Sequence, residues 1–196
     1  HYAIMASQNN IPAIIIGGPE ILPTLPGGVL PGTDQSSNVP ADSLERWNQI
    51  LVELRQNYSG QIFWAIPSDQ LESAPDFLNN VDQIYVLFSE PISSVSGASQ
   101  EDLNNSAAGL LDMQVYPLYE EFQRPIIVGI YYPSVKDASM GCQNPEDACE
   151  YFDYSEPVDI EEQAKIYTAL LSSCNERAWI NGFISRGYFA SVTIQD

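Results

Sequence analysis

The chain has 196 residues and carries 26 Asp and Glu against 7 Lys and Arg, a net charge of −19. Binding to a nucleic-acid backbone or to an anionic membrane surface needs clustered basic side chains, so this charge argues against both partners. The only histidine is His1, which leaves no internal imidazole for a Ser-His-Asp triad, a Cys-His pair or a histidine-rich zinc site.

The first elements are a helix end and a short apolar strand. Residues 2–9 are expected to form the end of a helix. Residues 11–18 (IPAIIIGG) form a β-branched run that ends in two glycines, which is typical of a buried parallel strand. Residues 19–40 are rich in Pro and Gly and too long for a plain connection. We therefore expect a functional loop after the first strand.

An amphipathic helix is predicted over residues 42–58, with Trp47 on its apolar face. Asp42 and Glu45 have the spacing of a capping box at its start. Apolar runs at residues 61–68 and 83–91 predict the next two strands.

The second half of the chain continues the alternation. Residues 101–122 predict a helix interrupted at Pro117, and residues 124–135 predict a strand. Asp159 and Glu162 form a second capping-box pattern, which opens a helix that runs to about Cys174 with this cysteine on its buried face. The last strand is expected at residues 179–188.

Short apolar strands that alternate with helices predict an α/β fold with a parallel sheet. No glycine-rich phosphate-binding motif follows a strand, and we expect neither a cofactor nor a metal. Polar or aromatic residues instead gather at the carboxyl ends of the strands, as in the active sites of (β/α)8 barrels. These residues are Glu20, Trp64, Glu90, Tyr131, Tyr132, Arg186 and Tyr188.

Four segments together resemble TIM-barrel glycoside hydrolases of the large retaining superfamily, which includes β-mannanases and cellulase-like enzymes. They are IIIGGPE (14–20), RWNQILVELRQNYSGQIFWA (46–65), RPIIVGIYYPS (124–134), and DIEEQAKIYTALL with WINGFISRGY (159–171 and 179–188). The resemblance runs from the third helix to the eighth strand of the (β/α)8 TIM barrel. It implies that residues 1–196 are the C-terminal portion of one barrel domain with about five strands. The N-terminal strands are expected either from the rest of a longer chain or from another segment that pairs with this one.

The same resemblance implies which residues hold the family's two catalytic positions. Glu20 matches the family's acid/base, although Pro19 stands where the family has Asn. The nucleophile position falls on Gly129 or Ile130, depending on the alignment, and neither side chain can ionise. The usual retaining mechanism is therefore not supported by these residues.

Glu90 is the best substitute for the second carboxylate, most simply as the base of an inverting mechanism. Its alternative role is to accept a hydrogen bond from the loop that follows it. Asp69 and Asp137, which follow other predicted strands, are further candidates.

Aromatic and basic side chains complete the expected site. Trp64 is either a platform on which a sugar ring stacks or a core residue. Tyr131 and Tyr132 are expected to point to opposite sides of their strand, so that one of them faces the substrate. Arg186 is a candidate for substrate binding, with a structural salt bridge as its alternative.

The cysteines and acidic residues suggest where the protein acts. Cys142 and Cys149 lie in a Gly/Asn/Pro loop that can fold back into a disulfide, which together with the strong acidity indicates an extracellular or cell-surface setting. The acidic segment 145–162 offers oxygen ligands for calcium but lacks EF-hand spacing, so a solvated loop is favoured.

Two functions follow as expectations. The first is a glycoside-hydrolase-like extracellular barrel that hydrolyses a polysaccharide or oligosaccharide through carboxylates, with the usual nucleophile missing. The second is a non-catalytic carbohydrate-binding or cell-surface structural module with a degenerate active site. No apolar run is long enough for a membrane span.

Overall fold

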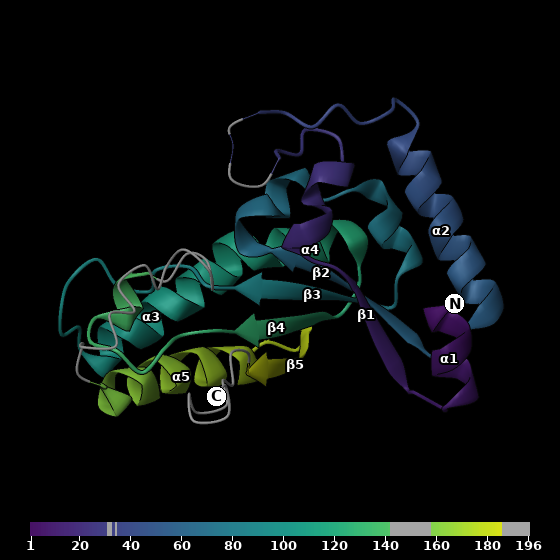
Figure 1. Ribbon diagram of the computed structural model, residues 1–196. Helices are drawn as coiled ribbons and strands as arrows, with labels where there is room; N and C mark the ends of the chain where they lie inside the picture. The colour runs from purple at the N-terminus through teal and green to yellow at the C-terminus, as the bar shows by residue number, and fades with distance from the viewer. Residues whose placement is uncertain (31–32, 34, 142–157, 186–196) are drawn as a thin grey trace, which may run out of the picture. The chain divides into compact units, whose positions relative to one another are not determined.

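The computed structural model describes residues 1–30, 33, 35–141 and 158–185 (Figure 1). Its strands form one sheet in which each strand is hydrogen-bonded to the next one in the sequence. The strands are β1 (Ala13–Gly17), β2 (Gln61–Pro67), β3 (Gln83–Phe88), β4 (Ile126–Ile130) and β5 (Ile180–Ser185). β1 and β2 run parallel in the register that pairs Ala13 with Gln61 and Gly17 with Ala65. The parallel sheet and the alternating helices confirm the predicted α/β class.

Helices connect most of the strands, and short helical turns follow several strand ends. The α-helices are α1 (Tyr2–Gln8), α2 (Ser43–Asn57), α3 (Gln100–Leu110), α4 (Tyr116–Phe122) and α5 (Ile160–Asn175). The 3-10 turns are η1 (Pro19–Thr24), η2 (Ser68–Ser73), η3 (Asp76–Asn80) and η5 (Ala138–Met140), and η4 (Leu111–Val115) is a π turn. The chain divides into two compact units, His1–Val86 with Leu118–Ile126, and Leu87–Pro117 with Ile127–Asp196.

In the first unit, α1 packs beside α2 (Figure 1). The buried side chains of this unit lie mainly on β2 and η3. α2 begins at Ser43, as predicted, but the predicted capping box is wrong because the Asp42 side chain accepts no cap hydrogen bond. Asp42 has φ −94 and ψ 15, which is not the extended backbone of a typical N-cap residue. Its carboxylate instead pairs with Arg46 at 2.9 Å.

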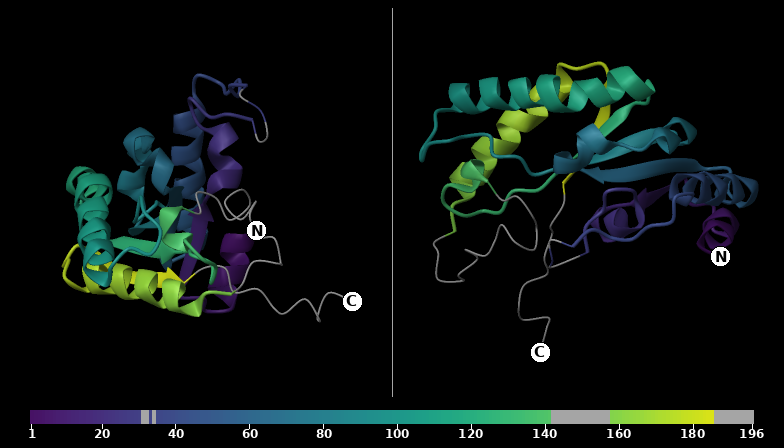
Figure 2. Two further views of the ribbon diagram at one scale, coloured as in Figure 1. Left: turned by 90° about the vertical axis from the view of Figure 1, so that its left-hand side faces the viewer. Right: turned by 90° about the horizontal axis from the view of Figure 1, so that it is seen from above.

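In the second unit, α3 packs against α5 (Figure 2). The predicted interruption lies just before Pro117, where the π turn η4 separates α3 from α4, although helical structure of one kind or another continues from residue 100 to residue 122. The backbone N–H of Tyr116 donates to the carbonyl of Leu111, five residues earlier, so that a widened π turn directly precedes the proline. Such a turn accommodates a residue that lacks the N–H of a regular helix.

α5 begins where the sequence predicted. The Asp159 carboxylate accepts the N–H of Glu162 at 2.9 Å, which confirms half of the second capping box. The backbone N–H of Asp159 donates to the carbonyl of Ser134 instead of to Glu162, so the reciprocal half is not formed. Cys174 is buried and free, as expected for the apolar face of this helix.

The expectation of a buried first strand is wrong. Ile15 in β1 is 49% exposed, and Phe183 in β5 is 52% exposed. β1 and β5 are the first and last strands in the sheet order, so within the described residues each has a strand neighbour on one side only. The strands between them, β2, β3 and β4, are buried over most of their length.

Candidate active site

Glu20 lies just beyond the carboxyl end of β1, in the first turn of η1, and is exposed. Two glycines with positive φ make the turn that leads to it, Gly17 (φ 91) and Gly18 (φ 106). The N–H of Gly18 donates to the carbonyl of Ala65 at 2.9 Å, which ties the turn to the end of β2. A Cβ built on Gly18 would lie 3.0 Å from Oε2 of Glu20, so the carboxylate folds back over this glycine.

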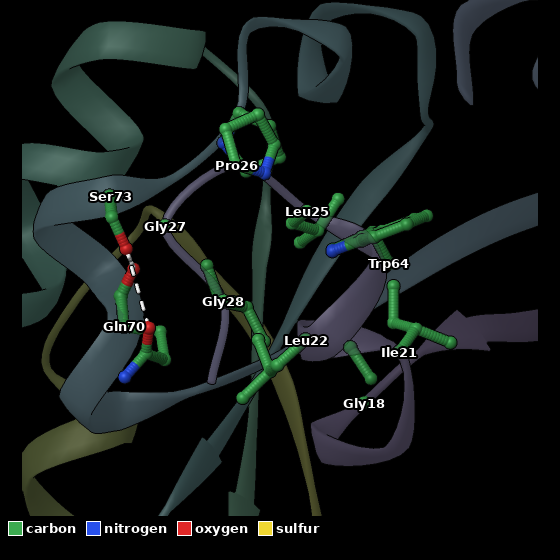
Figure 3. A pocket seen from close by; sticks show the side chains of 13 residues that line it. Gly18, Ile21, Leu22, Leu25, Pro26, Gly27, Gly28, Trp64, Gln70 and Ser73 are labelled. Carbon is green, nitrogen blue, oxygen red and sulfur yellow. Dashed lines mark hydrogen bonds between the residues drawn. The ribbon is translucent and has the colours of Figure 1, made fainter. Parts of the chain in front are cut away.

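A hollow of about 100 Å³ lies beside this turn, within the first unit. We call it the strand-end hollow. Its lining is mainly apolar, with Gln70 and Ser73 as polar side chains, and Figure 3 shows these two joined by a hydrogen bond of 3.5 Å. The lining residues are Gly18, Ile21, Leu22, Leu25, Pro26, Gly27, Gly28, Trp64, Ala65, Ile66, Gln70, Ser73 and Pro75. This is the end of the strands at which a TIM barrel places its active site.

Trp64 takes part in both the core and the strand-end hollow. It is 1% exposed, and its ring lies at centroid distances of 5.3 Å from Trp47 and 4.7 Å from Phe77. It also lines the strand-end hollow (Figure 3). Trp47 in turn donates its indole N–H to the hydroxyl of Thr24 at 3.2 Å, which connects α2 to η1. The aromatic cluster therefore supports the short helical turn that carries Glu20.

Glu90 lies two residues beyond β3, in the second unit, and is half-buried. The hydroxyl of Tyr132 donates to the backbone carbonyl of Glu90. Tyr132 and its neighbour Tyr131 are both buried, at 2% and 5% exposure. β4 ends at Ile130, so both residues belong to the connection after the strand, and the side-to-side alternation expected of a regular strand does not apply to them. Their contact with a substrate stays a prediction. The structure thus brings Tyr132 to Glu90, while Glu20 belongs to the other compact unit.

Two further predicted carboxylates lie in loops. Asp69 is exposed in η2, and its carboxylate accepts a hydrogen bond from the side-chain amide of Gln70 at 3.3 Å. Asp137 adopts a left-handed backbone with φ 58 and accepts a hydrogen bond from the hydroxyl of Ser96 at 2.7 Å. Within the described residues, no group of three His, Cys, Asp or Glu side chains is arranged to hold a metal ion.

The residues that the resemblance aligns with the nucleophile, Gly129 and Ile130, are buried in β4. Arg186, Tyr188 and the Cys142–Cys149 pair lie outside the described residues, as does most of the acidic segment. Their predicted roles stay predictions. In the part of the chain that the structure describes, no helix has the length and apolar character needed to cross a membrane.

Sequence reasoning missed one buried carboxylate. Glu162 is 6% exposed, and its side chain accepts hydrogen bonds from Ser139. The capping-box spacing identified the start of the helix, but it predicted that the Glu162 side chain would accept a hydrogen bond from the backbone N–H of Asp159. A carboxylate in the first turn of a helix carries no sequence signal for a partner on a distant loop.

Solved structures with the same fold are glycoside hydrolases. A complex of a family 113 β-1,4-mannanase matches with a TM-score of 0.63 and 18% identity, over 94% of this chain and 48% of that chain. The family 113 β-mannanase of Alicyclobacillus acidocaldarius in complex with ManMIm matches with a TM-score of 0.61 and 15% identity, over 96% and 48%. The chain therefore spans about half the length of these mannanases.

A β-glucuronidase from Ruminococcus gnavus in complex with D-glucaro 1,5-lactone is more distant, with a TM-score of 0.52 and 9% identity over 76% of this chain and 24% of that chain. At such identities the likenesses show the fold, and they confirm the resemblance to TIM-barrel glycoside hydrolases. No curated protein matches the chain. The sequence profile of Glycoside Hydrolase Family 113 matches residues 39–192, which is most of the chain, and the chain therefore belongs to this family.

Proposed function

We propose that the protein hydrolyses glycosidic bonds in a polysaccharide, with β-1,4-linked mannan as the first substrate to test. Membership of Glycoside Hydrolase Family 113 supports the reaction, and the β-1,4-mannanase activity of the similar solved structures supports the choice of substrate. The observation that carries the proposal is the position of Glu20, an exposed carboxylate directly after β1 and next to Gly18 of the strand-end hollow.

In the proposed reaction, Glu20 is the general acid. Its proton passes to the glycosidic oxygen as the bond from that oxygen to the anomeric carbon breaks. Glu90 is the general base, which takes a proton from a water molecule as the water oxygen bonds to the anomeric carbon from the opposite face. This is an inverting mechanism, and it is supported by Gly129 and Ile130, which provide no nucleophile at the positions that the resemblance indicates.

The experiment compares Glu20→Gln, Glu90→Gln and the control Glu72→Gln in the protein, with a panel of β-1,4-mannan and other glycans. We expect the first two variants to lose about 100-fold or more of the wild-type rate, as is usual when a general acid or base is removed. The control carboxylate Glu72 is exposed, like Glu20, and lies in the turn η2 that follows β2. It is not among the candidate catalytic residues, and the variant should keep its activity. Full activity of Glu20→Gln contradicts the proposal.

The stereochemistry of the product tests the role of Glu90. Proton NMR of the first turnover products should show the anomer opposite to that of the substrate. Retention of configuration would remove Glu90 from the role of base and point to a carboxylate nucleophile elsewhere in the protein.

A second candidate function is non-catalytic glycan binding, which is favoured by the absence of a carboxylate at both Gly129 and Ile130. The two candidates differ in one measurement. Binding of mannan by isothermal titration calorimetry, together with no hydrolysis of any glycan in the panel, supports the binding module. Hydrolysis that Glu20→Gln abolishes excludes it.

We also propose that the protein acts outside the cell or on its surface. The acidic composition and the spacing of Cys142 and Cys149 support this proposal. Fractionation of the source cells with an antibody to the chain tests it. Recovery of the protein only from the cell interior, with both thiols reduced, contradicts it.

A further inference from the structure

The indole N–H of Trp64 is a buried donor without an acceptor. The residue is 1% exposed, and in the part of the chain that the structure describes its N–H donates no hydrogen bond. The N–H of Trp47, by contrast, donates to the hydroxyl of Thr24 at 3.2 Å. A buried tryptophan N–H usually has a partner, because a hydrogen bond must replace its lost hydration. Trp64 therefore lacks one hydrogen-bond acceptor.

This donor faces the strand-end hollow. Figure 3 shows the indole nitrogen on the side of the Trp64 ring that is turned toward the other lining residues. The nitrogen is not sealed in the core, because the described side-chain atoms that are both enclosed and unpartnered are Ser43 Oγ and Arg124 Nε. A group that enters the hollow can therefore reach the N–H of Trp64.

The rest of the lining is apolar or already hydrogen-bonded. Isoleucine, leucine and proline side chains make up most of it, and none of the described lining residues is charged. The hydroxyl of Ser73 donates to the backbone carbonyl of Gln70 at 3.1 Å, and the side-chain amide of Gln70 donates to Asp69 at 3.3 Å. A group that fits this lining has an acceptor for Trp64, no N–H or O–H of its own, and an apolar end.

The volume of the hollow selects a small group. A cavity of about 150 Å³ is enough for benzene, so this hollow of about 100 Å³ has room for about four heavy atoms. An acetyl ester has this size, and it combines a carbonyl acceptor with an apolar methyl group and no donor. A whole sugar ring is larger than the hollow, and its hydroxyl groups would lose their hydration there.

The hollow also lies next to the candidate acid. Gly18 belongs to its lining, and a Cβ built on this glycine would lie 3.0 Å from Oε2 of Glu20. A substituent on a sugar bound at Glu20 is thus within reach of the hollow. We propose that the strand-end hollow binds an O-acetyl group of an acetylated β-1,4-mannan, and that Trp64 donates to its carbonyl oxygen. The inference rests on the proposed function for the identity of the sugar chain, whereas the hydrogen bond can be measured without any activity.

The first test measures binding in the Glu20→Gln variant, which limits cleavage of the probe. The probes are O-acetylated β-1,4-manno-oligosaccharides and the same oligosaccharides after deacetylation. We expect isothermal titration calorimetry to give a Kd about tenfold lower for the acetylated probe, because one small apolar group in a fitted pocket changes affinity by about this factor. Equal Kd values, or no binding of either probe, overturn the inference.

The second test follows the indole N–H signals of the three tryptophans by proton–nitrogen NMR after their assignment. The Trp64 signal should move downfield with the acetylated probe and keep its position with the deacetylated probe, because only the ester carbonyl accepts its hydrogen bond. The Trp47 signal is the internal control, since this N–H already donates to Thr24. A Trp64 signal that responds to neither probe, or equally to both, overturns the inference.

The third test fills the hollow from its exposed rim. Ser73→Leu puts a larger side chain on a lining residue and should reduce the preference for the acetylated probe from about tenfold to about twofold or less. The matched control is Glu72→Leu, the neighbouring residue on η2, which does not line the hollow and should keep the preference. Both replaced side chains are exposed, so both variants should fold. An unchanged preference in Ser73→Leu, or an equal loss in both variants, overturns the inference.

A separate hydrolysis assay of the wild-type protein distinguishes this inference from the proposed function. If the protein hydrolyses β-1,4-mannan but binds the two probes equally, the proposed function stands and the inference is overturned. If the protein hydrolyses no glycan, but prefers the acetylated probe and shows the response of the Trp64 signal, the proposed function fails and the hollow is supported as an acetyl-binding site.

Discussion

Arg177 donates two parallel hydrogen bonds to the carboxylate of Asp112, from Nε to Oδ1 and from Nη2 to Oδ2, both at 2.7 Å. The same guanidinium donates to the backbone carbonyls of Ser173 at 2.6 Å and Ala108 at 3.1 Å. One side chain therefore joins the last turn of α5 to α3 and to the π turn that precedes α4. The side chain of Arg177 is 11% exposed and that of Asp112 is 57% exposed, so water screens the attraction between the two charges. The two parallel hydrogen bonds from the guanidinium, which we call the Arg177 fork, therefore contribute more to stability than the charge attraction does.

Arg177→Lys should lower the free energy of unfolding by about 1–2 kcal/mol, because lysine keeps the charge but cannot make the forked set of hydrogen bonds. Urea denaturation followed by circular dichroism measures the change. The control is Arg46→Lys, whose ion pair with Asp42 is exposed on both sides and should be worth less than about 0.5 kcal/mol. An equal loss in both variants would contradict the role of the fork.

The pH dependence of stability offers a separate prediction for this pair. The hydrogen bond from Arg177 lowers the pKa of Asp112 below its usual value of 3.8. A carboxylate whose pKa is lowered in the folded state contributes stability above its unfolded pKa, and this is lost as the pH falls through the folded pKa. The difference in unfolding free energy between wild type and Asp112→Asn should hold above about pH 5 and shrink below pH 3.8. Urea titrations across this range measure it, and a difference that grows with acidity refutes the assignment.

Gly17 should tolerate no side chain. Its φ is 91, and a Cβ there would lie 2.6 Å from the carbonyl oxygen of Ala65, so Gly17→Ala should lose about 2 kcal/mol or more. Gly27→Ala is the control, since Gly27 has φ 77 but open space around its Cβ, and it should lose only about 1 kcal/mol from strain. Thermal unfolding ranks the two variants, and the reverse ranking would show that the close approach to β2 is unimportant.

Trp64→Ala should cost about 3–5 kcal/mol, because the ring is 1% exposed and packs against Trp47 and Phe77. Tyr2→Ala is the surface control, at 84% exposure, and should change stability by less than about 0.5 kcal/mol. Trp64→Phe separates the two roles of this residue. Lower glycan affinity at near wild-type stability would favour sugar stacking, whereas a stability loss without an affinity change would favour the core role.

Cys174 should be unreactive in the native protein. Burial raises the pKa of its thiol to about 11, so only about one thiol in a thousand is ionised at pH 8. Iodoacetamide at pH 8 should therefore label the Cys174 peptide only after unfolding in urea, as read by mass spectrometry. In the same unreduced, unfolded sample, the predicted bridge should keep Cys142 and Cys149 unlabelled. Labelling of all three would exclude that disulfide.

Patterns of a few residues were enough to predict the order of strands and helices. The apolar β-branched run before Gly17 predicted β1, because the run and the two glycines that end it are properties of the segment itself and need no distant contact. Asp159 likewise predicted the start of α5, since a side chain reaches an N–H three residues away without any tertiary contact. The same local rule failed at Asp42, where the backbone conformation and the nearby Arg46 set a different partner.

The sequence by itself determined the α/β alternation, the residues at the strand ends and the resemblance to a glycoside hydrolase family. Each of these depends on the types and spacing of residues that lie close together in the chain. Only the tertiary structure decided that Tyr132 reaches Glu90, that Glu162 holds Ser139 and that Trp64 is buried beside the strand-end hollow. A side chain's partner is chosen among segments far apart in the chain, and those segments become neighbours only when the buried strands and helices pack.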